Sequence, residues 1–381
     1  MFGVSTSIFN EAGSLVKDWL KNPLNSSFFY WYFLPAVGFV LLQLFVVGPA
    51  LGRPAPQVFN VQVAQGKGFT NLFLEILSGS FFTLLVLPLV AAVVLSALSA
   101  RVLLFFQGTL PIARPLFQPL LARNRRRNTE LYGPLLSLRR QYLFLVSHGV
   151  RLAVVDGEEK AVPVSAAELP ALTDQLKQQT QALHEKIESN PAAPDLPKDI
   201  ERVGATDLAN TLALAEEYPF ERYAIDTALF WPRLVAEIEP EKLDGIKSGF
   251  GALNGLLNLS LLIFLFAVEL IVLGIAITFD WTAHAAAPLL LGKWTLVALA
   301  FVGAMLSVLA AYGAYRAAVG SARAVGNSMR TAFDYYRGNV LRRFHLKMPS
   351  DLEEERVVWL KLSAFIRRGE SFYFPSEFRA D

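Results

Sequence analysis

The hydrophobic positions of this chain are gathered into four long blocks. The blocks cover residues 28–50, about 80–106, 256–279 and about 294–315. A run of about 18 or more apolar residues can cross the ~30 Å hydrocarbon core of a bilayer as a helix. The pattern therefore predicts a mainly α fold, a four-span integral membrane helical bundle. An α-rich cytoplasmic insert with a small β-hairpin is expected between spans two and three.

Two further helices are predicted at the membrane surface, on either side of span one. Within the N-terminal segment 1–27, residues 5–22 place seven apolar side chains on one face and two lysines opposite. This pattern is typical of a helix lying in the cytoplasmic interface, or of one packed on the protein's own soluble part. A single helix over 72–106 would be ~50 Å long, too long for one crossing. We therefore expect an outer interfacial helix at 70–78 and a kink at Pro88.

The insert, residues 108–242, contains signals for several separate elements. The stretch "RLAVVDGEEKAVPV" consists of two short β-prone runs around an Asp-Gly pair, which predicts a hairpin. Apolar residues at helical spacing from 169 to 187 predict an amphipathic helix. A proline-rich linker at 190–199 follows, and Thr206 is the expected N-cap of the next helix.

Apolar heptads extend spans three and four below the membrane. Before span three they are Leu243, Ile246, Phe250, Leu253 and Leu257, and after span four Val319, Ala322, Gly326, Met329, Phe333, Tyr336 and Val340. Residues 243–345 are therefore predicted to form the two spans and an antiparallel stalk, followed by a cytoplasmic tail at 346–381. Within span four, Gly303, Ser307 and Ala311 form a stripe of small residues that lets another helix approach closely.

The distribution of lysine and arginine predicts the orientation in the membrane. Segment 108–140 carries seven arginines and one acidic residue, whereas the connections 51–71 and 280–293 together hold three basic residues. The positive-inside rule then places both termini and the insert on the cytoplasmic side of the cell membrane. Aromatic residues mark the span boundaries, and they are Tyr30, Trp31 and Tyr32 on one side and Trp281 and Trp294 on the other.

Composition agrees with a membrane protein and removes several kinds of chemistry. Of 381 residues, 53% are hydrophobic and 18% charged, below the ~25% charged that is usual for soluble domains. The net charge of +2 gives no reason to expect nucleic acid as a partner. The chain has no cysteine, so disulfides, thiolate metal sites and cysteine nucleophiles are excluded. Its four histidines are scattered and no catalytic motif is present, so we expect no enzyme, no cofactor and no metal site.

The stretch "ATDLANTLALAEEYPFERYAIDTALFWPRL" resembles an uncharacterised family of bacterial multi-pass membrane proteins with the pattern Thr-x-Leu-Gly-Asn, Tyr-Gly-x-Asp and Trp-Pro-Arg-Leu. The matching positions are Thr206, Leu208, Asn210, Glu217, Tyr223, Asp226, Trp231, Pro232, Arg233 and Leu234. Ala209 and Ala224 stand where the family tends to have glycine. The resemblance extends over about 205–345; it implies cytoplasmic elements between spans two and three and brings no known activity.

Physical chemistry gives the Trp-Pro-Arg-Leu segment an interpretation of its own. Pro232 ends or kinks a helix, and Trp231 favours a mostly buried site. Arg233 favours a carboxylate or a lipid phosphate. We expect these residues, with Asp226, to hold the fold rather than to bind a ligand.

One carboxylate, Glu269, stands inside the third apolar block, in "LLIFLFAVELIVLGIAI". A charge at this depth is costly unless it is protonated or paired. Asn258 precedes it by eleven residues, ~20° round the helix, so the two side chains share a face. Glu269 lies ~15 Å and Gln43 ~10 Å from the outer ends of their spans, which makes Gln43 the expected neighbour. Two roles stay open, a structural polar clamp and an ion or proton pathway.

Four arginines recur every seven residues after span four, at Arg316, Arg323, Arg330 and Arg337. They form one stripe beside the heptad seam, either as a solvated flank or as a contact surface. In the second case Arg316 and Arg323 would hold anionic lipid headgroups, and Arg330 and Arg337 an acidic protein partner or a neighbouring subunit. We expect a membrane scaffold or effector that presents its cytoplasmic module for assembly or partner recruitment. The alternative is an oligomeric channel or transporter that uses Glu269.

Overall fold

The computed structural model describes residues 28–48, 86–148, 150–155, 158–165, 167–189, 195–279 and 292–369, which are mostly helical. The chain forms two compact units, residues 1–106 together with 219–381, and residues 107–218. The second boundary falls at Pro219, inside a helix, rather than near residue 242. The expected surface helices at 5–22 and 70–78, Trp281 and the end of the tail lie outside the described residues.

Three of the described helices are long and apolar enough to cross a membrane, as expected of an integral membrane protein. They are α6 (Leu87–Phe106), α11 (Pro240–Thr278) and α12 (Lys293–Arg343). A shorter apolar helix covers Phe29–Leu42. It contains α3 (Leu34–Leu42), between the π-helical turns η1 (Phe29–Phe33) and η2 (Gln43–Val47), and the backbone is helical from residue 28 to residue 48.

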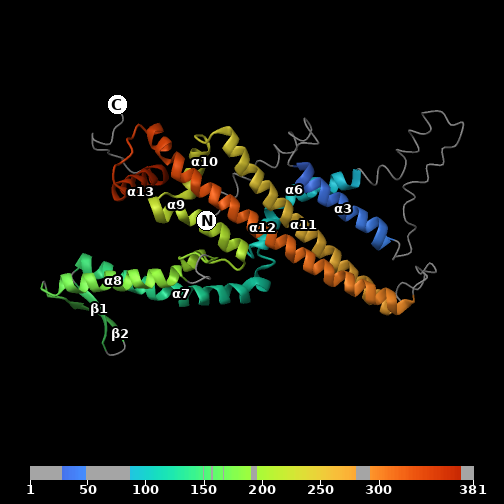
Figure 1. The fold of residues 1–381 in the computed structure, drawn as a ribbon, viewed down its shortest axis with the longest axis horizontal. Coiled ribbons are helices and arrows are strands. Elements are labelled where there is room, and N and C mark those ends of the chain that lie inside the picture. Colours follow the sequence, from blue (N-terminus) through green and yellow to red (C-terminus); the bar gives the residue numbers. More distant parts are fainter. Residues whose placement is uncertain are drawn as a thin grey trace. The chain divides into compact units, whose positions relative to one another are not determined.

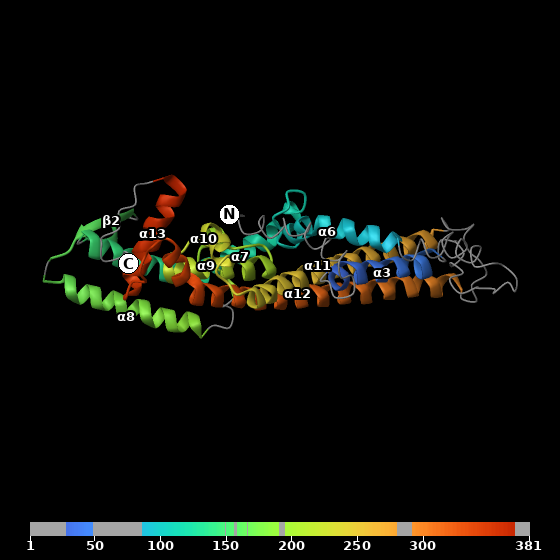
Figure 2. The same ribbon diagram turned by 90° about the horizontal axis from the view of Figure 1, so that it is seen from above.

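Helices α11 and α12 run side by side in opposite directions (Figures 1 and 2). Their contacts keep one antiparallel register along the pair, at Gly249 with Val325, Ser260 with Ala311, and Gly274 with Ala300. The heptad residues predicted on α12 are buried. Pro88 lies at the second residue of α6, so the predicted kink would involve residues outside the described part.

Small side chains line the contact between these two helices. Buried alanines on α12 include Ala300, Ala304, Ala311, Ala318 and Ala322. Ser260 Oγ donates a hydrogen bond to the carbonyl oxygen of Ala311 at 2.9 Å, and a side chain at Gly303 would touch Leu270. The small-residue stripe of span four therefore packs against α11 of the same chain, which uses the close approach that the stripe permits.

The lower end of α12 carries two short helices in the same unit. These are α10 (Thr227–Val235) and α13 (Leu352–Arg368), whose Phe230 and Trp359 rings meet edge to face, with centroids 4.9 Å apart. Trp231 of α10 lies against Phe333 of α12. We call this group, with residues 219–223, the head. The stretch expected as a cytoplasmic tail therefore contains a packed helix, α13.

The second unit consists of helices and one hairpin. It contains α7 (Arg114–His148), β1 (Val150–Val155), β2 (Glu158–Pro163), α8 (Leu169–Glu188), η5 (Ile200–Arg202) and most of α9 (Asp207–Tyr223). The predicted hairpin is confirmed, with Val155 opposite Glu158 in an antiparallel pair. The predicted amphipathic helix is confirmed as α8, and Thr206 Oγ1 caps α9 by accepting the N–H of Ala209 at 3.2 Å.

Candidate functional site

The intramembrane carboxylate meets the neighbour that its depth predicted. Gln43 Nε2 donates a hydrogen bond to Glu269 Oε2, and both side chains are half-buried. Gln43 is the first residue of η2, a π-helical turn. A π turn shifts the side chains that follow it round the helix axis, and such turns recur at functional or strained positions. An amide that donates to the carboxylate reduces the cost of placing Glu269 in an apolar helix.

A second layer of polar side chains joins η1, α6 and α11, nearer to the N-terminus of α11 than the Gln43–Glu269 contact. The hydroxyl of Tyr32 lies within hydrogen-bonding reach of Ser99 and Asn254, so three helices meet there. Tyr32 is 2% exposed, and a side chain at Gly255 would collide with Trp31. These two aromatics therefore pack against other helices of the bundle, whereas Tyr30 is exposed.

Asn258 completes this layer in an unusual way. Its side chain is 0% exposed. Within the described part of the chain, neither its Oδ1 nor its Nδ2 has a hydrogen-bond partner. On α11 it points ~40° from Leu262, which faces α3, and ~40° from Asn254, which faces α6. An unsatisfied buried amide costs roughly 1–3 kcal/mol, so Asn258 lowers the stability of the bundle core.

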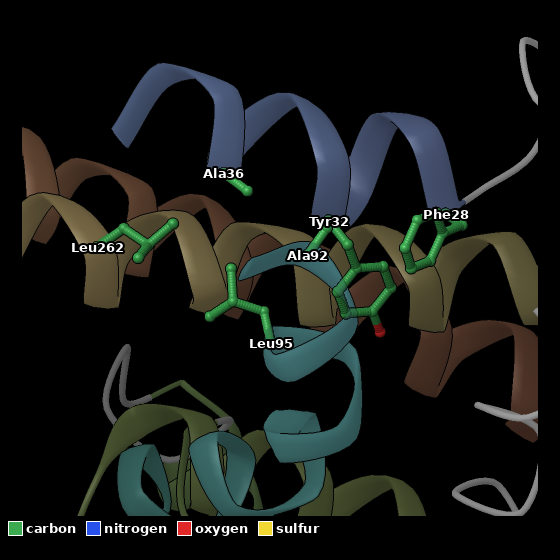
Figure 3. Close-up of a cluster of buried hydrophobic side chains, with 6 residues drawn as sticks. All are labelled: Phe28, Tyr32, Ala36, Ala92, Leu95 and Leu262. Carbon is green, nitrogen blue, oxygen red and sulfur yellow. The ribbon is translucent and has the colours of Figure 1, made fainter. Parts of the chain in front are cut away.

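An apolar cluster lies on the same helices (Figure 3). Ala36 of α3, Ala92 and Leu95 of α6, and Leu262 of α11 form it, together with the ring of Phe28 and the body of Tyr32. The Tyr32 hydroxyl points away from Leu262 in this view. Asn258 and Glu269 are ~16 Å apart along α11, and buried Leu262 and Phe266 lie between them on the protein-facing side. A chain of hydrogen bonds does not connect the two layers through these side chains.

The four arginines of the predicted stripe divide by environment along α12. Arg316 and Arg323 are exposed, and Arg330 and Arg337 are half-buried. Arg337 is engaged within the chain, because its Nε donates to Glu355 Oε1 of α13 at 2.8 Å. It also donates to the carbonyl oxygen of Asp334 and lies 4.1 Å from the centroid of the Tyr223 ring. Arg337 therefore has an ion-pair partner inside the head, and its expected contact with another protein stays a prediction.

Tyr223 joins this cluster from the end of α9. Its hydroxyl donates to Asp334 Oδ1 at 2.6 Å. Burial and this hydrogen bond raise the pKa of Tyr223 to about 12. Two acidic residues just before α11 pair with other basic residues, Glu237 with Arg343 at 2.7 Å and Glu239 with Lys242 at 3.0 Å.

The residues of the Trp-Pro-Arg-Leu segment hold the head together. Asp226 caps α10 by accepting the N–H of Leu229 at 3.1 Å, and it also pairs with Arg367 of α13. Trp231 is buried, while Pro232 lies exposed inside α10. Arg233 is exposed and donates to the carbonyl oxygen of Leu229, four residues earlier. These contacts are structural.

Ala224 adopts a left-handed backbone conformation, with φ of 59°. It ends α9, and its N–H donates to the carbonyl oxygen of Phe220 at 2.8 Å. Glycine is the usual residue at such a position because a Cβ is strained there. The tight turn is thus made despite the alanine.

Asn210 and Glu217, which match the family pattern earlier in the chain, accept hydrogen bonds from backbone N–H groups of the second unit. Asn210 Oδ1 accepts the N–H of Gly204 at 2.7 Å, and Glu217 Oε1 accepts the N–H of Asp199 at 3.4 Å. A Cβ at Gly204 would lie 2.3 Å from the Cβ of Ala209. The close approach of these two backbone segments therefore needs a small residue at both positions. Burial raises the pKa of the neighbouring Glu216 carboxyl, against the opposing effect of Arg202.

No group of three or more histidine, aspartate or glutamate side chains that could hold a metal ion occurs among the described residues. Comparison with protein-family models, with curated proteins and with solved structures found no match for the chain. The resemblance to a family of bacterial membrane proteins therefore stays a prediction.

Proposed function

We propose that the protein is a multi-pass scaffold of the cell membrane whose cytoplasmic parts serve assembly or the recruitment of a protein partner. One observation carries the proposal: α12 is a single helix, apolar over its first half, on whose second half α10 and α13 pack. A helix that continues unbroken from the bilayer into a packed head holds that head at a fixed distance from the membrane. This arrangement suits a protein that presents the surface of its head to a partner.

A fourth crossing by residues 28–48 is part of the proposal. At ~1.5 Å per residue this helix is about 30 Å long, close to the hydrocarbon thickness. It runs parallel to α11, because Trp31, Ala36 and Gln43 meet successively later residues of that helix. Spans one and three of a four-span protein must cross in the same direction. Reporter fusions at the C-terminus and near residue 60 should therefore show opposite sidedness, and equal sidedness would contradict the topology.

Glu269 serves in this scaffold as a polar clamp between α11 and the first span. The apolar side chains beneath it support this role over an ion or proton pathway, since Leu262 and Phe266, the buried residues of α11 that pack toward the first span below Glu269, are apolar. The alternative stays an oligomeric channel or transporter that uses Glu269. The small-residue stripe that would allow subunits to pack closely is occupied by α11 of the same chain.

Site-specific photo-cross-linking in the native membrane tests the proposal. Tyr335 on the head portion of α12 is 76% exposed, and Leu309 on the membrane portion of the same helix is 60% exposed. A photoreactive residue at Tyr335 should give a protein adduct of defined mass, either with a second copy of the chain or with another protein. The matched residue at Leu309 should give lipid adducts. Lipid or solvent products at both positions would contradict a recruiting head.

A further inference from the structure

The start of α7 exposes an unusual amount of apolar surface. Ile112, Leu116 and Leu120 are 89%, 73% and 45% exposed. Leu116 and Leu120 are four residues apart on α7 and so differ by ~40° round the helix, and Ile112 lies in the turn just before it. We call these three residues the apolar stripe. Exposed Pro119 lies on the same arc. Scattered surface leucines are normal, whereas a continuous apolar stripe marks an interaction surface.

This stripe is not part of the core of its own unit. The core-facing side of α7 carries Ala113, Asn128 and Tyr132, all nearly fully buried. Asn128 and Asn124 donate hydrogen bonds from that side to backbone carbonyls of the 197–205 segment. These residues lie ~60–160° round the helix from Leu116. The helix therefore has one face that packs within the unit and a separate apolar face that does not.

Arginines continue the exposed face along α7. Arg123, Arg126 and Arg127 fall within the same arc as the apolar stripe, and all three are exposed. One acid on this face, Glu130, pairs with Arg126 at 2.9 Å. An apolar stripe that passes into a basic one complements the boundary between acyl chains and anionic headgroups.

The covalent path of the chain places this face next to the bilayer. Helix α6 ends at Phe106, and the stripe begins six residues later at Ile112, so at most ~20 Å of chain separates them. The connection turns at Gly108, which has φ of +72°. A side chain at Gly108 would collide with Phe117 of α7 and with Ala205, so packing within the unit fixes the turn.

We propose that residues 112–127, the end of the turn before α7 and the first part of that helix, lie on the cytoplasmic leaflet of the membrane. Ile112, Leu116 and Leu120 insert at the boundary between headgroups and acyl chains, and Arg123, Arg126 and Arg127 bind anionic lipid headgroups. The proposal rests on the cytoplasmic placement of residues 107–218 given under the proposed function.

The absence of cysteine from the sequence allows a direct test on the full chain. Single variants Leu116→Cys and Leu120→Cys are labelled with a nitroxide and reconstituted into vesicles of equal parts phosphatidylcholine and phosphatidylglycerol. Gln118→Cys is the matched control, because Gln118 is exposed ~160° away from Leu116. Labels at 116 and 120 should collide with oxygen more than with a water-soluble nickel chelate, and the label at 118 should show the reverse. Equal access of the chelate to all three, or shielding of 116 and 120 from both reagents by protein, would overturn the proposal.

The binding of anionic headgroups by the arginines is tested by changing the lipid composition and the arginines together. With phosphatidylcholine alone the Leu116→Cys label should lie nearer to water, and Arg123→Gln with Arg127→Gln should abolish this dependence on anionic lipid. Arg125→Gln, on the other flank of the helix, should leave the dependence unchanged. A depth that does not respond to anionic lipid would overturn headgroup binding. Labelling of Gln118→Cys by an impermeant maleimide from the outer side would refute the topology instead, so the two failures are distinguishable.

Discussion

Arg337 and Glu355 form the ion pair that joins the long helix α12 to α13. The Arg337 Nε–Glu355 Oε1 distance is 2.8 Å, and Glu355 is 3% exposed. The same carboxylate oxygen accepts the indole N–H of Trp359 at 3.1 Å. Both donors of this acceptor would lose their partner if the carboxylate were replaced by an apolar group. The pair is therefore the point at which the head is most sensitive to a single change.

We expect Glu355→Leu to destabilise the head by roughly 3 kcal/mol, because it leaves a half-buried guanidinium uncompensated. Hydrogen exchange of α13 amides measures this loss. Glu353→Leu is the control on the same helix, since Glu353 is exposed and reaches Arg356 only at 4.0 Å. Equal protection of α13 in both variants would contradict the role given to the pair.

Ala224→Gly should stabilise the protein by about 1 kcal/mol, because glycine adopts the left-handed conformation of Ala224 without the strain of a Cβ. The midpoint of thermal unfolding in detergent reports the change. Ala228→Gly, at an exposed position inside α10, should instead lose about 1 kcal/mol. A lower midpoint for both variants would mean that the turn at Ala224 is not left-handed.

The head should lose stability at alkaline pH through Tyr223. Its folded-state pKa of about 12 lies above the ordinary value near 10, so the fold favours the neutral hydroxyl. This contribution is complete below pH ~10 and is lost as the pH rises through about 12. Tyr223→Phe should remove this part of the pH dependence, as measured by exchange of α10 and α13 amides. An unchanged alkaline profile in the variant would exclude Tyr223 as its source.

Asn258→Leu should raise the midpoint of thermal unfolding, since it replaces an unsatisfied buried amide by an apolar group of similar size. The expected gain is roughly 1 kcal/mol. Asn258→Ala, which removes the amide and leaves a cavity, is the comparison and should not gain as much. A loss of stability in the leucine variant would show that the amide has a partner.

Much of the membrane part follows from the sequence, because depth and helical phase are simple functions of residue number. The Gln43–Glu269 contact is of this kind. Helical phase also predicts the burial of the heptad residues Phe333 and Val340 on the second half of α12. The polar layer at Tyr32 was missed for a physical reason. A tyrosine near the end of an apolar block is typical of the membrane interface, and only its packing beside Ser99 and Asn254 shows that it faces inward.

The elements outside the apolar helices followed less completely from the sequence. Helix α7 contains Pro119 and Pro134, which argue locally against a helix of 35 residues, and tertiary packing overrides them. Helix α13 carried a usable signal, with acidic residues in its first turn, basic residues in its last and Gly369 after its end. The partner of Arg337 could not be derived, because its contact with Glu355 depends on how α13 folds back against α12.

Ion and proton flux into vesicles reconstituted with the wild-type protein and with Glu269→Gln distinguishes a polar clamp at Glu269 from a transport pathway. If Glu269 is a clamp within a closed scaffold, both proteins should give the same flux as protein-free vesicles under proton, sodium and potassium gradients. The glutamine variant, which keeps size and hydrogen bonding, should also unfold within ~1 kcal/mol of the wild type. A flux in the wild type that Glu269→Gln abolishes would contradict the scaffold and establish Glu269 as part of a transport pathway.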